Sequence, residues 1–377
     1  MEERIAIVGW AMTPFSRCHR NYHRGELVNS AMMSLVKSTN VPIERIDYFC
    51  DASDDVLDGI SISNCLMIEA MGAFMKEETK IEEDGAFAAM HALQRLRLGY
   101  YKTAVVVAHG KVSDSSPEAY SNLINEPFYQ RPLGLESLTA HALQADRFLQ
   151  KKRATVEDAA HWAVRCHQNG LNNPQAHGAK DLTFDQVMKS KNLASPIRRW
   201  DASPITDGAA CILMAVESEA KKITRNPVWI DGVGFSHDLH YIGHREDLAD
   251  PRSAREAARM AYAMAGVKDP RREIDLAEIY GHFTYQDLML MEALGLCEEG
   301  QAGQFSKSAF PVNPSGGALC ANPVMVTGLV RLIEAAMQLT GAAGKHQVKK
   351  PVKRAVAHAV SGLCLQSNLV TVLSTGA

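Results

Sequence analysis

The stretch REIDLAEIYGHF (Arg272 to Phe283) decides the fold, together with two stretches that follow it, SGGALCANPVMVTGLVRLIEAAMQLTG (Ser315 to Gly341) and KRAVAHAVSG (Lys353 to Gly362). The first and third stretches carry short apolar runs that predict buried strands. The long middle stretch, with glycine near its start, predicts a helix. The C-terminal part of the chain therefore has the order strand, helix, strand.

The same order occurs once earlier in the chain. ERIDYFCDA (Glu44 to Ala52) is followed by DGAFAAMHALQRLRLG (Asp84 to Gly99) and then by KTAVVVAHG (Lys102 to Gly110). An internal repeat is a stronger indication of topology than any single motif. It predicts a mixed α/β fold built from two similar halves, residues 1–225 and 226–377.

The composition is that of a globular protein with a large core. The 377 residues are 46% hydrophobic and carry a formal net charge of -3, so no overall basic field attracts nucleic acid. Eight cysteines occur without a CxxC pair, which favours reduced thiols in a cytoplasmic protein and argues against a metal site. The sequence lacks a run of about 18 uninterrupted apolar residues, so no membrane span is expected.

Three glycine-bearing blocks lie near the C-terminus: EIYGHFTY (Glu278 to Tyr285), NPSGG (Asn313 to Gly317) and AHAVSGL (Ala357 to Leu363). Their order resembles the C-terminal half of the thiolase superfamily, especially sterol-carrier-protein-type and archaeal thiolases, whose blocks read roughly HDCFT, NxSGG followed by GHPxGATG, and HNxGGSG. SPITDGAA (Ser203 to Ala210) similarly resembles the family's CSPISDGAA. The resemblance implies a duplicated thiolase-type αβαβα layered fold, with an inserted loop domain at about residues 118–193.

The resemblance also implies coenzyme A as the substrate thioester, no cofactor bound tightly by this chain, and a homodimer core. FSHDLHYIGHREDL (Phe235 to Leu248) resembles the family's loop that contacts coenzyme A, although a solvated surface loop is the alternative. The glycine-rich blocks are further candidates because family glycines supply backbone amides. The candidate cofactor-binding residues are Gly243, His244, Arg245, Gly316, Gly317 and Gly362.

The chain departs from the family where the nucleophilic cysteine is expected. A thiolase cysteine lies at a helix N-terminus, where the helix dipole favours the thiolate. The aligned stretch KIEEDGAFAAM places Glu82 at the cysteine position, and a carboxylate there cannot carry an acyl group as a stable thioester. Glu82 is therefore a catalytic candidate of a different kind, while Glu83 and Asp84 are expected to cap the helix.

Four further catalytic candidates come from the glycine-bearing blocks and their neighbourhood. Asn322 replaces the histidine of GHP, and it is either an oxyanion donor or a helix cap. Tyr280 replaces the first histidine of HDCF with a phenol that can donate a hydrogen bond or shuttle a proton, and His282 shares its face on an extended segment. His358 matches the histidine of HNxGGSG.

Three functions remain open at this stage. The favoured one is retro-aldol cleavage of a β-hydroxyacyl-CoA, because such a reaction needs no acyl-enzyme. The chain resembles thiolase-like side-chain aldolases. These aldolases work with an accessory subunit containing a zinc ribbon and an OB fold, so a heterotetramer is expected. The alternatives are a thiolase-type acyltransferase for an aromatic or branched acyl-CoA, with Cys320 or Cys364 recruited, and a non-catalytic carrier of acyl-CoA or lipid. The favoured interpretation of both thiols is that they are small buried fillers.

Overall fold

The computed structural model describes residues 3–376. One large mixed sheet contains nine strands in the order β3-β2-β4-β7-β1-β8-β11-β10-β9. These strands are β1 (Ile5–Met12), β2 (Tyr48–Ala52), β3 (Glu77–Ile81), β4 (Thr103–Lys111), β7 (Asp207–Val216), β8 (Val228–His237), β9 (Leu276–Glu278), β10 (Arg354–Ser361) and β11 (Ser367–Ser374). The short strands β5 (Asn192–Ala194) and β6 (Ile197–Arg198) pair separately.

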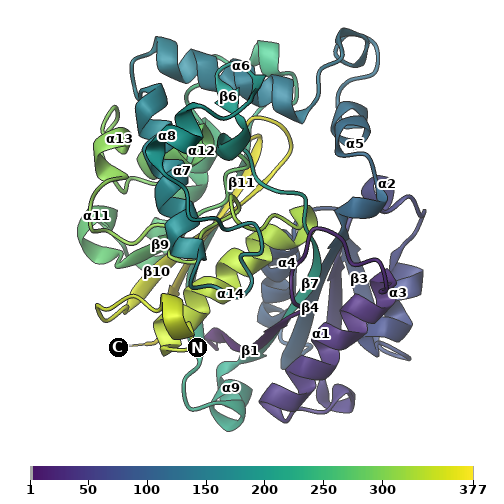
Figure 1. The fold of residues 1–377 in the computed structure, drawn as a ribbon. Helices are drawn as coiled ribbons and strands as arrows, with labels where there is room; N and C mark the ends of the chain where they lie inside the picture. The colour runs from purple at the N-terminus through teal and green to yellow at the C-terminus, as the bar shows by residue number, and fades with distance from the viewer. Residues whose placement is uncertain (1–2, 377) are drawn as a thin grey trace.

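Helices cover both faces of the sheet and its upper end in the view of Figure 1. The α-helices of the described chain are α1 (Arg24–Thr39), α2 (Asp55–Asp58), α3 (Asn64–Met71), α4 (Gly85–Arg97), α5 (Pro117–Leu123), α6 (Ser137–Gln150), α7 (Val156–Gly170), α8 (Phe184–Met188), α9 (Glu217–Ile223), α10 (Arg252–Ala265), α11 (Pro270–Glu273), α12 (Thr284–Ala293), α13 (Ala302–Phe305) and α14 (Thr327–Thr340). Among residues 3–376, no helix has the length and apolar character needed to cross a membrane.

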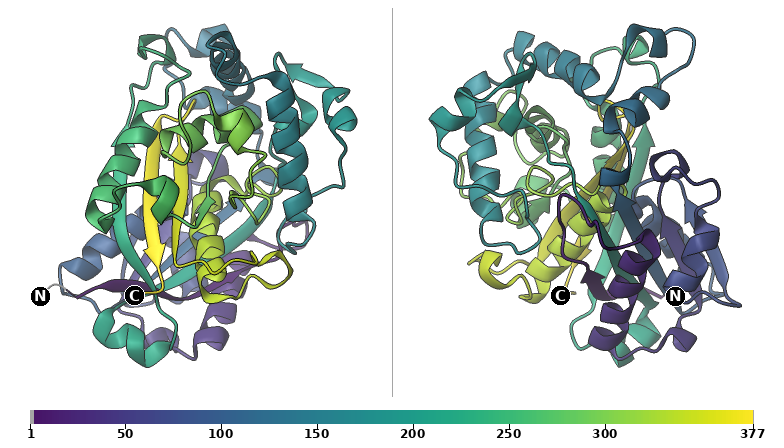
Figure 2. Two further views of the ribbon diagram at one scale, coloured as in Figure 1. Left: turned by 90° about the vertical axis from the view of Figure 1, so that its left-hand side faces the viewer. Right: turned by 45° about the vertical axis from the view of Figure 1, so that its right-hand side comes forward.

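The sheet shows the predicted repeat in its strand directions. In the first half, β2 is parallel to β4, and the pairs β4–β7 and β7–β1 are antiparallel. In the second half, β9 is parallel to β10, and the pairs β10–β11 and β11–β8 are antiparallel. The left view of Figure 2 shows β10 and β11 side by side in yellow. The duplicated α/β fold predicted from the sequence is therefore confirmed.

The two half-sheets meet along a short seam between β1 and β8. Ala6 pairs with Trp229 and Ile7 with Val228. The equivalent helices α4 and α14 lie between the halves (Figure 1), α1 packs on the outer face of the first half, and α10 packs on the outer face of the second. These are the five layers of the αβαβα fold that the resemblance implies.

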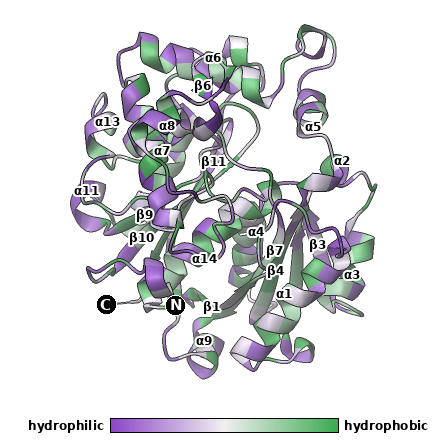
Figure 3. Ribbon diagram, in the orientation of Figure 1, coloured by the Kyte–Doolittle hydropathy of each residue, from purple (hydrophilic) through white to green (hydrophobic). Residues whose placement is uncertain are grey.

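The central helices can approach each other because small residues line their contact. A Cβ built on Gly85 would lie 2.7 Å from Ala108 Cβ and 2.9 Å from Leu329 Cβ, closer than real Cβ atoms come. Glycine is thus required at the start of α4. In Figure 3, which is coloured by hydropathy, strands β4 and β7 are largely green and therefore hydrophobic, whereas the peripheral helix α11 is purple and hydrophilic.

The segment around residues 118–193 forms α6, α7 and α8 and part of α5, above the ends of the strands in Figure 1. Buried Trp162 of α7 donates its indole N–H to Asp287 of α12 at 2.8 Å, which attaches this segment to the second half. The helical segment is therefore in a position to supply walls for a site at the strand ends.

Candidate active site

A cavity of about 210 Å³ lies where the loops that follow β9 and β10 and the loop that precedes β7 meet the segment containing α5 and α6. Residues from the first and third glycine-bearing blocks and from the segment after the second line it. The polar groups of its lining that carry the chemistry below are Asp84, Tyr120, His141, Tyr280, His282 and Asn322. The site thus combines both halves of the chain with the helical segment between them.

Tyr280, Asn322 and His282 form one hydrogen-bonded group in this cavity. The Tyr280 phenol donates to Asn322 Oδ1 at 2.9 Å, and the Thr327 hydroxyl donates to the same oxygen at 2.7 Å. The Asn322 amide nitrogen donates to Ser203 Oγ at 2.9 Å and faces His282 Nδ1 at 3.3 Å. The structure therefore brings together three of the catalytic candidates predicted from the sequence.

These bonds determine where the proton of the His282 ring lies. Because Asn322 Oδ1 accepts two hydroxyl groups, its amide nitrogen is the atom that donates to His282 Nδ1, and the ring N–H is then on Nε2. Burial, with a smaller contribution from His141, lowers the pKa of His282 to about 3. His282 is consequently a neutral hydrogen-bond donor near pH 7.

His141 of α6 is a second neutral imidazole on the cavity wall. Its Nδ1 faces the Ser137 carbonyl oxygen, and its Nε2 accepts the backbone N–H of Cys364 at 3.1 Å. Burial lowers the pKa of His141 to about 4. Its ring centroid lies 5.7 Å from that of His282. The pair therefore adds no positive charge to the cavity, which suits a site where negative charge is held by hydrogen bonds.

Asp84 lies at the start of both central helices. Its Oδ1 accepts the backbone N–H of Ala86 at 2.8 Å and so caps α4, as the sequence predicts, while Oδ2 accepts the N–H of Gly328 in α14 at 2.6 Å. The side chain is buried and lines the cavity. Burial outweighs these bonds and raises the pKa of Asp84 to about 7. A carboxyl group of this kind can exchange protons near neutral pH.

Tyr120 of α5 is a second phenol in the lining. Its hydroxyl donates to Asp54 Oδ2 at 2.9 Å. Burial, and next the charge of Asp54, raise the pKa of Tyr120 well above its ordinary value. The phenol therefore stays protonated, and Asp54 holds its proton in a defined direction.

The structure corrects the prediction for Glu82. This side chain is exposed and does not line the cavity: Oε1 lies 3.0 Å from Lys80 Nζ, and Oε2 accepts the N–H of Asp55 at 3.0 Å. Strand β3 ends at Ile81, the chain bends at Glu82 and Glu83, and α4 begins only at Gly85. Asp84, and not Glu82, is thus the carboxylate at the helix start, and Glu83 does not form the cap bond.

His358 also lies outside the cavity, so a direct catalytic role is corrected to a supporting one. It is completely buried in β10, where Nδ1 accepts the backbone N–H of Tyr280 at 3.3 Å and Nε2 donates to Asn368 Oδ1 at 2.9 Å. Burial lowers the pKa of His358 to about 4. Neutral His358 therefore fixes the backbone that carries Tyr280.

The candidate cofactor-binding residues are dispersed. Gly362 lines the cavity, whereas Gly316 and Gly317 lie outside it in the buried loop before Cys320. Arg245 is turned inward, and its guanidinium donates to the carbonyl oxygens of Leu239, Cys364 and Leu363 at 2.8, 2.7 and 3.0 Å, which leaves it poorly placed for a phosphate. Gly243 and His244 are exposed, and His244 lines a separate hollow.

The two thiols that the sequence offers as alternative nucleophiles, Cys320 and Cys364, do not line the cavity. Cys320 Sγ faces the carbonyl oxygen of Cys166 at 3.5 Å, and Cys364 Sγ faces that of Ala140 at 3.3 Å. Burial raises the pKa of both thiols to about 12. Within the described chain, the lining of the cavity contains no cysteine. Both thiols match the interpretation as buried fillers.

A larger vestibule of about 790 Å³ adjoins the cavity and shares Ser121, Ser203 and Phe283 with it. Its basic side chains are Arg17, Lys180 and Arg199, and none of them forms an ion pair with a residue of the described part of the chain. The Arg199 guanidinium carbon lies 5.1 Å from the centre of the Trp200 ring. The lining also contains Glu118 and Glu136, so the vestibule offers three cations unpaired within residues 3–376 and an aromatic face beside two carboxylates.

The comparisons with known proteins agree with this architecture. A family model described as "Thiolase C-terminal domain-like" matches residues 234–375. The acetyl-CoA acetyltransferase of Methanothermobacter thermautotrophicus is 26% identical over 359 residues, which cover 92% of this chain and 93% of that protein. The 17-hydroxy-3-oxo-4-pregnene-20-carboxyl-CoA lyase of Mycobacterium tuberculosis is 25% identical over 367 residues, 90% of this chain and 92% of that protein.

The fold is shared with solved structures as well. A structure of an Ltp2-ChsH2(DUF35) aldolase superposes with a TM-score of 0.82 over 99% of this chain and 98% of the aldolase chain, at 19% sequence identity. The duplicated sheet and central helices described above define the same class of protein. The family model, the relatives and the shared fold together support membership of this chain in the thiolase superfamily.

Three groups of the cavity were not among the predicted catalytic residues. Asp84 was interpreted as a cap alone, although its position directly before Gly85 was a signal that it faces the helix start. Tyr120 and His141 lie in the helical segment, where the sequence contains no motif that points to the cavity. Their position depends on how α5 and α6 pack over the strand ends, which is a long-range property.

Proposed function

We propose that this protein makes or breaks a carbon–carbon bond in a coenzyme A thioester, by retro-aldol cleavage of a β-hydroxyacyl-CoA. One observation carries the proposal: the cavity has phenol, imidazole, amide and carboxyl groups in its lining, and in the portion of the chain that the structure describes no thiol is among them. Covalent acyl transfer needs an activated nucleophile, whereas an aldol cleavage needs positioned acids, bases and hydrogen-bond donors.

The reaction requires three tasks from the site. A base removes the proton of the β-hydroxyl group, the Cα–Cβ bond breaks, and its electron pair becomes the enolate of the thioester. The His282 Nε2–H is a donor for the enolate oxygen, supported by Asn322 and Tyr280. Asp84, whose carboxyl has a pKa of about 7, is suited to return a proton to the enolate carbon. The direct test is to incubate the protein with β-hydroxyacyl-CoA and to identify the carbonyl compound and shorter acyl-CoA by chromatography.

The alternative function is a thiolase-type acyltransferase, the activity in the name of the Methanothermobacter relative. The two functions differ in their dependence on Cys320 and Cys364. For an aldol cleavage, we expect Cys320→Ala and Cys364→Ala to keep kcat within about threefold of the wild type, because neither thiol lies in the cavity. Mass spectrometry of the wild type should then show no acyl-enzyme.

A cysteine variant without activity, together with an acyl group on that cysteine in the wild type, would establish acyl transfer instead. A protein that binds acyl-CoA and catalyses neither reaction, with its partner present, would support the non-catalytic carrier.

We place the nucleotide part of coenzyme A in the vestibule, next to Arg17, Lys180 and Arg199. These cations have no ion-pair partner among residues 3–376, and phosphates are bound well by guanidinium and ammonium groups. The Glu118 to Leu193 segment contributes Glu118, Leu138 and Lys180 to the lining at this position. It does not use Arg245, whose donors are occupied by backbone oxygens.

Replacing Arg199 with Ala is expected to raise KM for the coenzyme A thioester about tenfold with little change in kcat, because an exposed charge-assisted contact is worth about 1.5 kcal/mol. The matched control is a substrate with a short thiol in place of coenzyme A, which has no nucleotide to bind. Its KM should be equal for the wild type and the variant, and an equal rise for both substrates would contradict this placement.

We further propose that the protein is cytoplasmic and acts as a homodimer joined to an accessory subunit with a zinc ribbon and an OB fold. The name of the Ltp2-ChsH2(DUF35) aldolase supports the idea of a second subunit. All eight cysteines are free thiols in the structure, which is consistent with a reducing compartment. Co-purification with the product of a neighbouring small reading frame, followed by light scattering, tests the assembly.

A further inference from the structure

We propose that Tyr120 and Asp54 form a proton relay in the wall of the cavity. Tyr120 binds the β-hydroxyl group of the substrate and takes its proton, while Asp54 takes up the proton of the Tyr120 phenol. This inference rests on the proposed retro-aldol function, and it assigns the base that the reaction needs. Neither residue belongs to the group formed by Tyr280, Asn322 and His282. Tyr120 would contact the substrate directly, whereas Asp54 acts through it.

The direction of the hydrogen bond supports this role. Tyr120 lines the cavity, and its hydroxyl donates its proton to Asp54 Oδ2 at 2.9 Å. Since the proton is directed at Asp54, the lone pairs of the phenol oxygen remain to accept a hydroxyl group of a ligand. Tyr120 and Tyr280 both line the cavity, and Tyr280 is close enough to contribute to the raised pKa of Tyr120, so the substrate hydroxyl would be bound near the enolate site.

Asp54 is held in place at both oxygens. Oδ1 accepts the backbone N–H of Leu57 at 2.9 Å and so caps α2, while Oδ2 accepts the Tyr120 phenol. One carboxylate therefore joins the short helix α2 to the cavity wall. Fixed second partners of this type orient a catalytic side chain and reduce its freedom before the substrate arrives.

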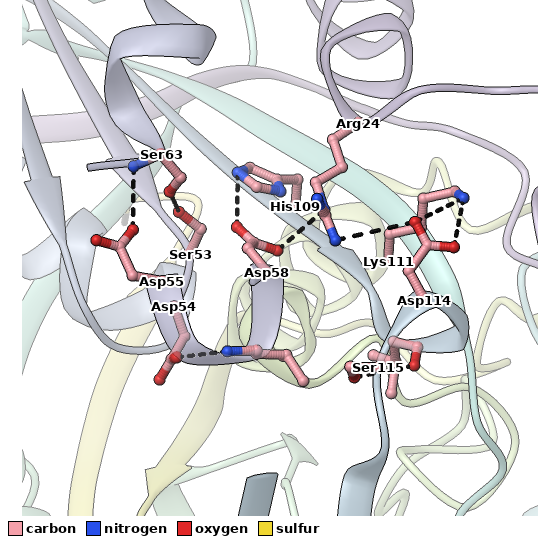
Figure 4. Close-up of polar contacts among 12 residues, drawn as sticks. Arg24, Ser53, Asp54, Asp55, Asp58, Ser63, His109, Lys111, Asp114 and Ser115 are labelled. Carbon is pink, nitrogen blue, oxygen red and sulfur yellow. Dashed lines mark hydrogen bonds and ion pairs between the residues drawn. The ribbon is translucent and has the colours of Figure 1, made fainter. Parts of the chain in front are cut away.

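The other end of α2 is fixed by buried charge. Figure 4 shows Asp54 at the start of α2 and Asp58 at its end, between Arg24 and His109. Asp58 Oδ1 lies 3.2 Å from Arg24 Nε, and Asp58 Oδ2 lies 3.9 Å from His109 Nε2. Asp58, Arg24 and His109 are all buried. Because α2 has a single turn, this anchor at Asp58 also determines the position of Asp54.

The proposed step is balanced in atoms and electrons. The O–H bond of the β-hydroxyl breaks and its proton passes to the Tyr120 oxygen, while the Tyr120 proton passes to Asp54. The electron pair left on the substrate oxygen forms the new carbonyl bond, and the pair of the broken Cα–Cβ bond becomes the thioester enolate. The phenol never has to exist as a free phenolate, which matters because its pKa is raised.

Asp54→Asn is the decisive variant. Asparagine is an equally good N-cap, with its single oxygen on the Leu57 N–H and its amide nitrogen in the place of Oδ2 beside the Tyr120 phenol, and this amide cannot take up a proton. We expect kcat for cleavage of β-hydroxyacyl-CoA to fall by about 10²-fold or more with KM nearly unchanged. Tyr120→Phe should lower kcat similarly, and the double variant should be no slower than the slower single variant, because both changes interrupt one relay.

Asp269→Asn is the matched control, since Asp269 caps α11 through its side chain and lies away from the cavity. It should keep the wild-type kcat. If the wild type cleaves the substrate and Asp54→Asn is equally active, the relay is wrong and the proposed function stands. If the wild type with its partner does not cleave β-hydroxyacyl-CoA, the proposed function fails and the relay fails with it.

Discussion

Replacing Tyr280 with Phe is expected to lower kcat for carbon–carbon bond cleavage by about 10²–10⁴-fold, the usual contribution of a positioned acid–base group. The phenol donates to Asn322, whose amide nitrogen in turn faces His282, and all three residues line the cavity. Burial raises its pKa above the ordinary range, so it acts as a neutral donor. Steady-state kinetics with a β-hydroxyacyl-CoA should show the loss mainly in kcat.

Tyr262→Phe provides the control for this change. Tyr262 is also buried, and its hydroxyl donates to the Leu294 carbonyl oxygen at 2.8 Å, but it does not line the cavity. Its removal should cost stability and leave kcat close to that of the wild type. Equal kcat for Tyr280→Phe and the wild type would show that the Tyr280 phenol has no part in the chemistry.

Replacing Arg331 with Met is expected to lower the free energy of unfolding by about 3–5 kcal/mol, because it leaves a buried carboxylate without its counter-ion. Arg331 of α14 and Glu278 of β9 are both buried, with Arg331 Nη1 2.5 Å from Glu278 Oε2. Ser315, from the second glycine-bearing block, donates its hydroxyl to the same oxygen at 2.7 Å. This group therefore joins two of the three blocks to the central helix.

Urea denaturation followed by circular dichroism measures the effect. The double variant Arg331→Met with Glu278→Gln removes both charges and should regain part of the loss, because the remaining amide has a smaller desolvation cost. A single variant within about 1 kcal/mol of the wild type would mean that Glu278 is already neutral in the folded protein.

The repeat predicted most of the fold because its apolar runs are long and its two copies agree. Strand β11 (Ser367–Ser374) was not singled out from the sequence, although it completes the second half by pairing with β10 and β8. Its sequence SNLVTVLS has polar residues at both ends and inside, and it becomes a central strand only because helices cover both faces of the sheet.

The site was predicted where a block kept its place in the sequence. Tyr280, His282 and Asn322 meet because β9 and the segment before α14 end at the same edge of the sheet. The sequence alignment with Gly85 put Glu82 at the helix start, but an alignment gives only the position along the chain. It does not determine whether the side chain points into the cavity or to the surface. The neighbouring Lys80 keeps Glu82 at the surface.

Asp84 breaks the internal symmetry of the duplicated fold. Its counterpart at the start of α14, Val326, makes no side-chain cap, and Asp84 accepts N–H groups from both helices instead. The two halves of the fold are thus joined by one carboxyl group that lines the cavity. If the chain were cut between the two halves, the hydrogen bonds of Asp84 would have to form again before the cavity was complete. The fraction of activity recovered would therefore measure how well the two halves associate.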